Sequence, residues 1–204
     1  MARQIITGID IGSFQVKVII AEHAFEQGHF SPKIIGNATA DTKGIERGYI
    51  TNTAEAATSV ETAIARAEKM AGLKVKRAYV SFGGIGLGSI TESGTIAISR
   101  ADLEITERDL SAALEAAEQA IPKASSLNKK IINTIPVEWR IDGKPVWGEA
   151  RGLKAQKLEV KALFITALEH HVSELIKTVE LAGVEVVDVV AAPVAASFVT
   201  VSKK

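Results

Sequence analysis

The sequence predicts a mixed α/β (α+β) fold, in which strands and helices follow one another along 204 residues. Three observations support this fold class. Two β-branched runs flank a glycine turn near the amino terminus, three segments repeat apolar residues at helical spacing, and short apolar runs end at glycine or proline. A glycine-dense segment, Gly83–Gly88, separates two regions of different character. We therefore expect a boundary between two subdomains there.

The composition is that of a folded protein with balanced charge. Apolar residues make up 47% of the chain, and 24 Lys and Arg balance 24 Asp and Glu. A chain of this length buries roughly 70% of its unfolded surface. Because the charges balance, there is no basic field, and nucleic acid is not an expected partner. The absence of cysteine excludes disulfides, thiolate nucleophiles and zinc–cysteine sites. No segment approaches the ~20 apolar residues of a membrane span, so a cytoplasmic location is expected.

The first elements are strands. Residues 5–10 and 16–21 are rich in β-branched side chains, and Gly12 followed by Ser13 predicts a tight turn between them. Residues 32–40 predict a third strand. The amino-terminal region therefore begins with antiparallel strands.

A helix should follow the loop Gly44–Gly48. Thr53 is the expected N-cap, and Gly72 stands where a left-handed C-cap belongs. Residues 78–82 then predict a short buried strand. The expected apolar stripe of the helix consists of Ala57, Val60, Ile64, Ala67 and Ala71.

After the glycine-dense segment, residues 90–99 alternate as an edge or hairpin strand does. Thr106 and Asp109 have the spacing of a capping box, and Pro122 should end the helix that they begin. The expected apolar stripe of this helix consists of Leu110, Ala113, Leu114, Ala117 and Ile121.

Two further strands are expected over residues 130–141 and 158–166, with a loop over residues 142–156 between them. Trp139 and Trp147 flank the start of this loop. Both tryptophans are compatible with a local core and with a partner surface.

Thr166 and Glu169 suggest another capping box, which would open a helix that ends at Gly183. Residues 184–190 predict a buried strand, and residues 193–201 begin a helical segment. The inward side chains of the helix should be Val172, Leu175, Ile176, Val179 and Ala182.

The first hairpin is the strongest candidate for chemistry. The turn at Gly12 and Ser13 can direct backbone N–H groups at an anion, and Asp10 precedes it. Gln15 and Lys17 share one face of the second strand because side chains alternate. A carboxylate beside a phosphate-binding turn suits hydrated Mg²⁺. A plain hairpin with solvated polar ends is the alternative on spacing alone.

Other signatures fail or are weak. No Gly-x-x-x-x-Gly-Lys-Ser/Thr motif occurs, which excludes a Walker-type NTPase. In Gly83–Gly88 the third glycine of a dinucleotide motif is replaced by Ser89, and a strand rather than a helix should follow. His170 and His171 are adjacent, so on a helix they point about 100° apart and do not share a metal. No catalytic triad is evident.

Several stretches together resemble FtsA, the actin-like protein of bacterial cell division. The hairpin is similar to the first phosphate motif that actin, sugar kinases and heat-shock chaperones share. The segments that narrow the resemblance to FtsA occur in matching order: Gly44-Ile-Glu-Arg-Gly48, Ala67-Glu-Lys-Met-Ala-Gly72, Tyr79-Val-Ser-Phe-Gly-Gly84, Glu104-Ile-Thr-Glu-Arg-Asp-Leu110, Val137-Glu-Trp-Arg-Ile-Asp-Gly143, Leu158-Glu-Val and Val179-Glu-Leu-Ala-Gly-Val184.

The resemblance implies an actin-like, ribonuclease-H-type subdomain 1A over residues 1–82 and 167–204. A strand-helix-strand-strand subdomain 1C would occupy residues 83–166. It also implies ATP and Mg²⁺ as cofactors of the complete family protein, with Asp10 acting through Mg²⁺-bound water. Gly12 and Ser13 would offer N–H groups to the β- and γ-phosphates.

The chain departs from the family at the site itself. Gln15 stands where many relatives have lysine, and Lys17 on the same face is a candidate for the missing charge. The second phosphate loop, the adenosine loop, the FtsZ-docking subdomain and the membrane-binding helix of the family have no counterpart in this sequence. We therefore expect little ATP binding by this chain and no enzyme activity of its own, with at most a weak ATPase in the complete form.

In the complete family protein, subdomain 1C mediates self-association. FtsZ and other division proteins are the partners, and the protein lies at the inner face of the membrane at the division site. The membrane would be reached only through the segment that this sequence lacks. An alternative is a PilM-like actin-fold scaffold of pilus assembly. A sugar or acetate kinase is disfavoured by the 1C-like segment.

Overall fold

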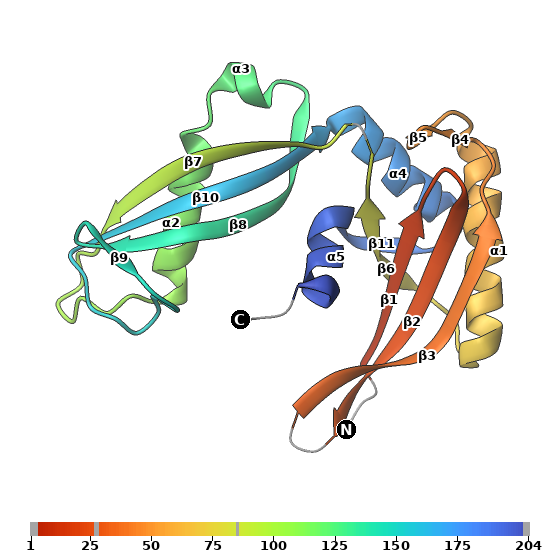
Figure 1. The fold of residues 1–204 in the computed structure, drawn as a ribbon, viewed down its shortest axis with the longest axis horizontal. Coiled ribbons are helices and arrows are strands. Elements are labelled where there is room, and N and C mark those ends of the chain that lie inside the picture. Colours follow the sequence, from red (N-terminus) through yellow and green to blue (C-terminus); the bar gives the residue numbers. More distant parts are fainter. Residues whose placement is uncertain (1–3, 27–28, 85, 202–204) are drawn as a thin grey trace. The chain divides into compact units, whose positions relative to one another are not determined.

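The computed structural model describes residues 4–26, 29–84 and 86–201. These residues fall into two compact units (Figure 1). The first unit contains the residues up to Leu87 and those from Leu168 onward. The second unit, called the insert below, contains Gly88–Ala167. The chain therefore crosses between the units after Leu87 and again after Ala167.

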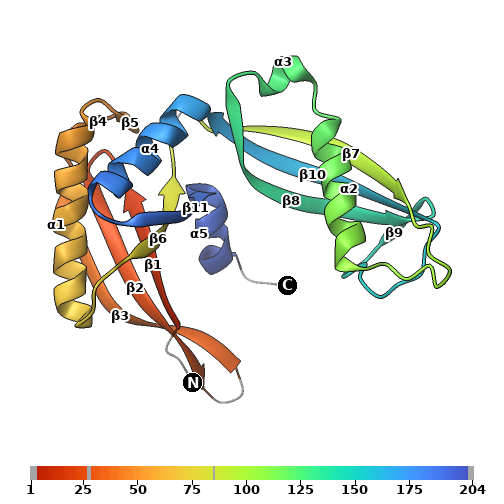
Figure 2. The ribbon, with the colours of Figure 1, turned by 180° about the vertical axis from the view of Figure 1, so that it is seen from behind.

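The first unit is built on a five-stranded mixed sheet with the order β11-β6-β1-β2-β3. Strands β1, β2 and β3 pair antiparallel, whereas β6 runs parallel to both β1 and β11 (Figures 1 and 2). This is the mixed sheet expected of an actin-like subdomain. The strands are β1 (Gln4–Ile11), β2 (Gln15–Glu26), β3 (His29–Asp41), β6 (Arg77–Phe82) and β11 (Glu185–Ala191).

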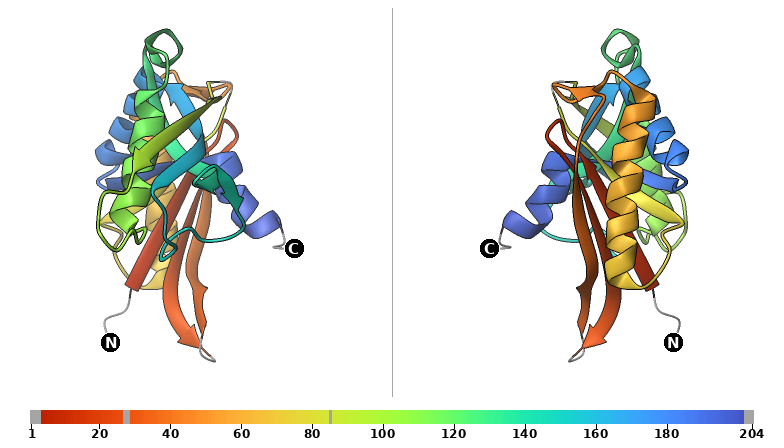
Figure 3. Two further views of the ribbon diagram at one scale, coloured as in Figure 1. Left: turned by 90° about the vertical axis from the view of Figure 1, so that its left-hand side faces the viewer. Right: turned by 90° about the vertical axis from the view of Figure 1, so that its right-hand side faces the viewer.

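Alternating side chains bury one face of this sheet. Along β2, Val16, Val18 and Ile20 are buried, whereas Lys17 and Ile19 are exposed. The buried face faces two helices, because α1 contacts β2 and β3, and α4 contacts α1 and β11. Helix α5 contacts β6 and β11, and Figure 3 shows it on the side opposite to α1. The helices are α1 (Thr53–Ala71), α4 (Glu169–Leu181) and α5 (Ala192–Thr200).

Helix α1 begins one residue earlier than predicted. Its N-cap is Asn52, whose Oδ1 accepts a hydrogen bond from the Glu55 N–H at 3.2 Å. Thr53 is therefore not the cap, and its hydroxyl donates to Glu174 Oε2 of α4 at 3.0 Å instead. The C-cap at Gly72 is confirmed, with φ of 68° in the left-handed region.

The segment Gly44–Gly48 forms the first strand and the turn of a small hairpin, in which β4 (Ile45–Glu46) pairs with β5 (Tyr49–Ile50). Its two connecting residues, Arg47 and Gly48, have φ of 53° and 83°. Positive φ at both central positions is the geometry of a type I′ turn, which matches the twist of the strands. The predicted loop is therefore a tight turn with a fixed shape.

The insert is a four-stranded sheet with the order β7-β10-β8-β9, and α2 packs on β7. Its core includes Phe164, Leu158, Val160, Ile105 and Ala113. The predicted strand-helix-strand-strand order is present, and β9 is an addition. The elements are β7 (Gly88–Ala97), α2 (Glu107–Gln119), α3 (Lys123–Ser126), β8 (Lys129–Ile141), β9 (Lys144–Val146) and β10 (Lys157–Leu168).

Two local predictions in this region are wrong. Thr166 and Glu169 do not form a capping box, because β10 continues through Leu168. Leu168 occupies the N-cap position of α4, and its side chain makes no capping hydrogen bond. The alternating burial of β10 outweighs the short capping pattern there. The predicted loop over residues 142–156 contains β9, which pairs with β8 across the turn at Asp142 and Gly143.

No helix among residues 4–26, 29–84 and 86–201 is long and apolar enough to cross a lipid bilayer.

Candidate phosphate-binding site

The turn between β1 and β2 has a fixed backbone. The Gly12 N–H donates to the Gln15 carbonyl oxygen at 3.2 Å, so this N–H is engaged within the turn. Thr42, which directly follows β3, holds the turn through two hydrogen bonds. Thr42 Oγ1 donates to the Gly12 carbonyl oxygen at 2.8 Å, and the Thr42 N–H donates to the Phe14 carbonyl oxygen at 3.2 Å. Within the described residues, the N–H groups of Ser13 and Phe14 donate no hydrogen bond. These two N–H groups are therefore available to donate to a ligand.

Asp10 lies where three strands meet. It pairs in register with Lys17 of β2 and with Ser81 of β6. Ser81 Oγ donates to Asp10 Oδ1 at 2.5 Å, and Lys17 Nζ lies 3.5 Å from Asp10 Oδ2. The Asp10 side chain is 46% exposed and that of Lys17 is 58% exposed. One carboxylate oxygen is thus oriented by a hydroxyl, while the other faces an ammonium group and solvent.

Gln15 lies on the same face of β2 as Lys17, as the alternation predicts, and opposite Asp41 of β3. Within the described residues its side chain makes no hydrogen bond. The structure therefore places Asp10 and Lys17 together, whereas Gln15 lies nearer the turn.

The hydroxyl of Ser13 connects the turn to the β4–β5 hairpin. Ser13 Oγ accepts a hydrogen bond from the Gly48 N–H at 2.8 Å. The backbone of Gly84 passes close by, since a Cβ at Gly48 would lie 3.4 Å from the Gly84 Cα. Next along the hairpin, the Tyr49 ring contacts that of His171 in a tilted arrangement, with 4.4 Å between the ring centroids. The Ser13 hydroxyl hydrogen remains free to donate to a ligand.

Three contributors to this site were missed by the sequence interpretation: Ser81, Thr42 and Gly48. A weak signal exists for Ser81, because alternation along residues 78–82 puts it opposite to the buried Ala78 and Val80. The sequence gives no indication that this strand lies beside the first one. That neighbour relationship is what brings Ser81 to Asp10.

Within the described residues, the remaining sequence candidates supply no hydrogen bond or ion pair to Asp10, Ser13 or Lys17. Glycine-dense residues 83–88 lead into a strand, as predicted. No group of three or more His, Asp or Glu in the described part of the chain could hold a metal, the pair at His170 and His171 included. Trp139 packs against the core of the insert, whereas Trp147 is 95% exposed. The two tryptophans, equivalent in the sequence, have different surroundings.

A mixed sheet of this order, together with an inserted strand-helix-strand-strand domain, defines an actin-like subdomain with an SHS2-type insertion. Comparison with known proteins agrees. The family model described as the SHS2 domain inserted in FtsA matches residues 84–166.

Curated relatives match over nearly the whole chain. FtsA of Streptococcus pneumoniae is 34% identical over 96% of this chain, and FtsA of Bacillus subtilis is 28% identical over 98%. The chain spans 41% and 44% of the length of these relatives. The chain is therefore related to FtsA, over a region that contains the SHS2 domain.

A solved structure shares the fold. The PilM–PilN type IV pilus biogenesis complex matches 95% of this chain with a TM-score of 0.59 at 14% identity, and the match covers 49% of that chain. At this identity the likeness shows the actin-like fold and the insertion, and nothing further. The sequence relationship is to cell division proteins.

Proposed function

We propose that this chain supplies one wall of an ATP phosphate site in an FtsA-type cell division protein. The observation that carries the proposal is the position of Asp10, which Ser81 orients at 2.5 Å beside the turn. Asp10 would hold Mg²⁺ through bound water, since Mg²⁺ usually takes only one or two protein oxygens. The N–H groups of Ser13 and Phe14 would donate hydrogen bonds to phosphate oxygens, as the backbone N–H groups of anion-binding nests do.

Lys17 would supply the positive charge that Gln15 lacks. Its ammonium group lies 3.5 Å from Asp10 Oδ2. A phosphate bound at the turn offers this ammonium group a second anionic partner. Movement of Lys17 toward the phosphate would then leave the carboxylate of Asp10 to the hydrated cation.

We assign the first unit to subdomain 1A and the insert to subdomain 1C. By analogy with FtsA, the insert would provide contacts for self-association. Contact with FtsZ and placement at the membrane would belong to the complete protein at the division site. The chain by itself would bind partners rather than turn over nucleotide.

Isolated, this chain should bind ATP weakly. The phosphate contacts of a single wall must offset the translational and rotational entropy that ATP loses on binding. We therefore expect a dissociation constant of about 1 mM or above. Calorimetric titration of Mg²⁺–ATP into the chain measures it. A sub-millimolar dissociation constant would contradict the expectation that the second wall is needed.

The location of binding is tested separately by amide NMR. Mg²⁺–ATP should shift the amide signals of Ser13 and Phe14 first, and Lys17→Ala should reduce these shifts. Lys33→Ala is the matched control, because Lys33 is an exposed lysine of the neighbouring strand. Equal effects of the two substitutions would remove Lys17 from the proposed site, and unshifted turn amides would refute the phosphate wall.

A further inference from the structure

Strand β7 forms an open edge of the insert sheet. It is the first strand in the order β7-β10-β8-β9, so β10 is its one pairing partner among the residues that the structure describes. The pairing runs without a register shift from Thr166↔Gly88 to Lys157↔Ala97. In an antiparallel ladder, every second residue of an edge strand directs its N–H and C=O away from its neighbour. One regular row of hydrogen-bonding groups therefore lies along this edge.

The other edges of the two larger sheets in the described chain carry features that hinder pairing. Strand β9 has three residues, one of which is Pro145, and the part of β8 beyond it includes Pro136. Strand β3 contains Pro32 and has a register shift in its pairing with β2. Strand β11 has a register shift between Val186 and Asp188. Prolines, bulges and short strands are among the usual means of protecting an edge.

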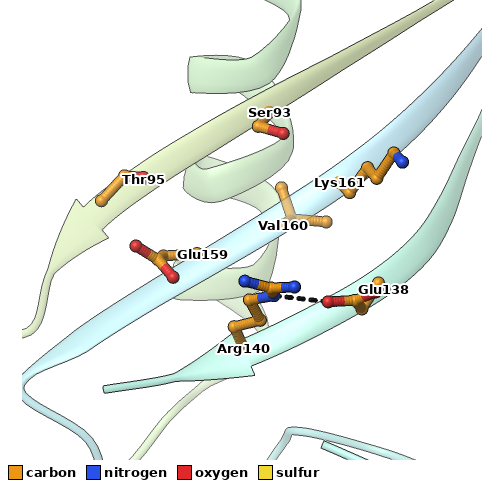
Figure 4. A pocket seen from close by; sticks show the side chains of 7 residues that line it. All are labelled: Ser93, Thr95, Glu138, Arg140, Glu159, Val160 and Lys161. Carbon is orange, nitrogen blue, oxygen red and sulfur yellow. Dashed lines mark hydrogen bonds and ion pairs between the residues drawn. The ribbon is translucent and has the colours of Figure 1, made fainter. Parts of the chain in front are cut away.

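Strand β7 has none of these protections. Its ten residues include no proline, lysine or arginine. Ser89, Thr91, Ser93 and Thr95 are exposed on the face of the sheet away from α2. Figure 4 shows Ser93 and Thr95 on this strand, beside the charged side chains of the central strands. A long, regular and unprotected edge is a template for strand addition.

We infer that the β7 edge binds an extended segment of another protein, which adds a strand to the insert sheet. Main-chain hydrogen bonds would supply the affinity, and alternate side chains would supply the specificity. The inference does not depend on the proposed phosphate site, which belongs to the other unit.

Symmetric antiparallel pairing of two copies through β7 is sterically disfavoured. Helix α2 lies directly over β7, since a Cβ at Gly94 would be 2.1 Å from the Ala113 carbonyl oxygen. Paired strands lie about 4.8 Å apart, whereas packed helices need about 8–10 Å. Two copies paired in this way would bring their α2 helices too close. A segment without its own helix on that face avoids the clash.

The side chains of β7 indicate the kind of segment that fits. The outer face offers threonine and serine hydroxyls, which pair well with β-branched side chains. The α2 face offers the half-buried Ile90, Glu92 and Ile96. Among the described residues, Glu92 forms no ion pair. The fitting segment alternates β-branched and apolar residues and places one lysine opposite Glu92.

A synthetic probe can test the edge directly. The probe is an acetylated, amidated peptide of sequence Thr-Val-Thr-Lys-Thr-Val-Thr, titrated into the 204-residue chain. Hydrogen exchange should slow at alternate amides of β7 and not along β8. The same peptide with N-methyl groups on its three central amides should bind at least about tenfold more weakly, because it cannot complete the ladder.

Two variants sharpen the result. Glu92→Gln should reduce the affinity for the lysine peptide and leave that for a peptide with glutamine in place of lysine unchanged. Glu115→Gln, an exposed carboxylate of α2, is the matched control and should change neither. Absence of binding, equal binding of the N-methylated peptide, or protection elsewhere would overturn the inference. Concentration-dependent dimers with protected β7 amides would overturn the choice of occupant.

Discussion

Asp109, in the first turn of α2, connects the helix to Thr106 and to Arg100 in the preceding loop. Its carboxylate accepts hydrogen bonds from the N–H of Thr106 at 2.7 Å and from Arg100 Nη2 at 2.6 Å. Arg100 also donates to the Glu104 carbonyl, so the preceding loop is tied to the helix. The predicted capping box is present, and the arginine is an addition that the spacing does not indicate. The hydrogen bonds from Arg100 and Thr106 outweigh partial burial and hold the pKa of Asp109 far below its ordinary value.

Asp109→Asn should destabilise the insert by about 2 kcal/mol at neutral pH, the scale of a charge-assisted hydrogen bond. Because the pKa of Asp109 is lower in the folded state, its ionised form stabilises the fold above its unfolded pKa of about 3.9. This stabilisation is lost as the pH falls below that value. Urea unfolding of both proteins between pH 7 and 3 should show a difference that shrinks with acid. A constant difference would mean that the substitution acts through packing instead.

Individual residues were predicted unevenly, and the reason is physical. Asp10 and Lys17 follow from local spacing, because strand alternation and a tight turn act over a few residues. Ser81 joins them from a strand that is 71 residues away in the chain. Only the order of strands in the sheet creates that contact. Sequence spacing carries no information about such an order.

The packing of α2 on β7 depends on the absence of a side chain at one position. A Cβ at Gly94 would lie 2.1 Å from the Ala113 carbonyl oxygen and 2.4 Å from the Ala117 backbone nitrogen. Both atoms belong to the helix backbone and cannot move aside without shifting the helix. The small Ala113 and Ala117, both fully buried, complete this close contact.

Gly94→Ala should therefore destabilise the insert by about 3 kcal/mol, the upper range of overpacking. Gly8→Ala is the matched control, because a Cβ at Gly8 of β1 would have no atom within 4 Å. The control should change the free energy of unfolding by less than about 0.5 kcal/mol. Thermal and chemical unfolding of both variants provide the comparison. Equal stability of the two would refute the close contact.

Elements were predicted where a periodic pattern is long. Helices α1 and α2 carry several turns of apolar spacing, and β10 alternates over nearly its whole length. The errors lie at ends and short strands, where tertiary contacts decide. Asp142 is an example, since its Oδ1 accepts hydrogen bonds from the N–H groups of Gln156 and Lys157 and so ties the two ends of the predicted loop together.

At the scale of the molecule, the sequence indicates two subdomains but not how each sheet is ordered. The glycine-dense segment marks one crossing, because its composition differs from its surroundings. The second crossing lies inside the continuous pattern that runs from β10 into α4, with no break in composition. After the second crossing, the chain rejoins the first sheet through β11, which pairs in parallel with β6.

The insert should fold without the rest of the chain. It has its own core, around Phe164 and Leu158, and its ends meet because Gly88 and Thr166 are partners on neighbouring strands. Adjacent ends and a separate core are the properties of inserted domains that fold alone. Residues 88–167 expressed alone should therefore unfold in one cooperative thermal transition. Asp109→Asn should lower the melting temperature of the isolated insert by about 4–8 °C for each kcal/mol of stability lost. The same substitution should also destabilise the insert within the 204-residue chain. A non-cooperative transition in the isolated insert would show that its stability depends on the first unit.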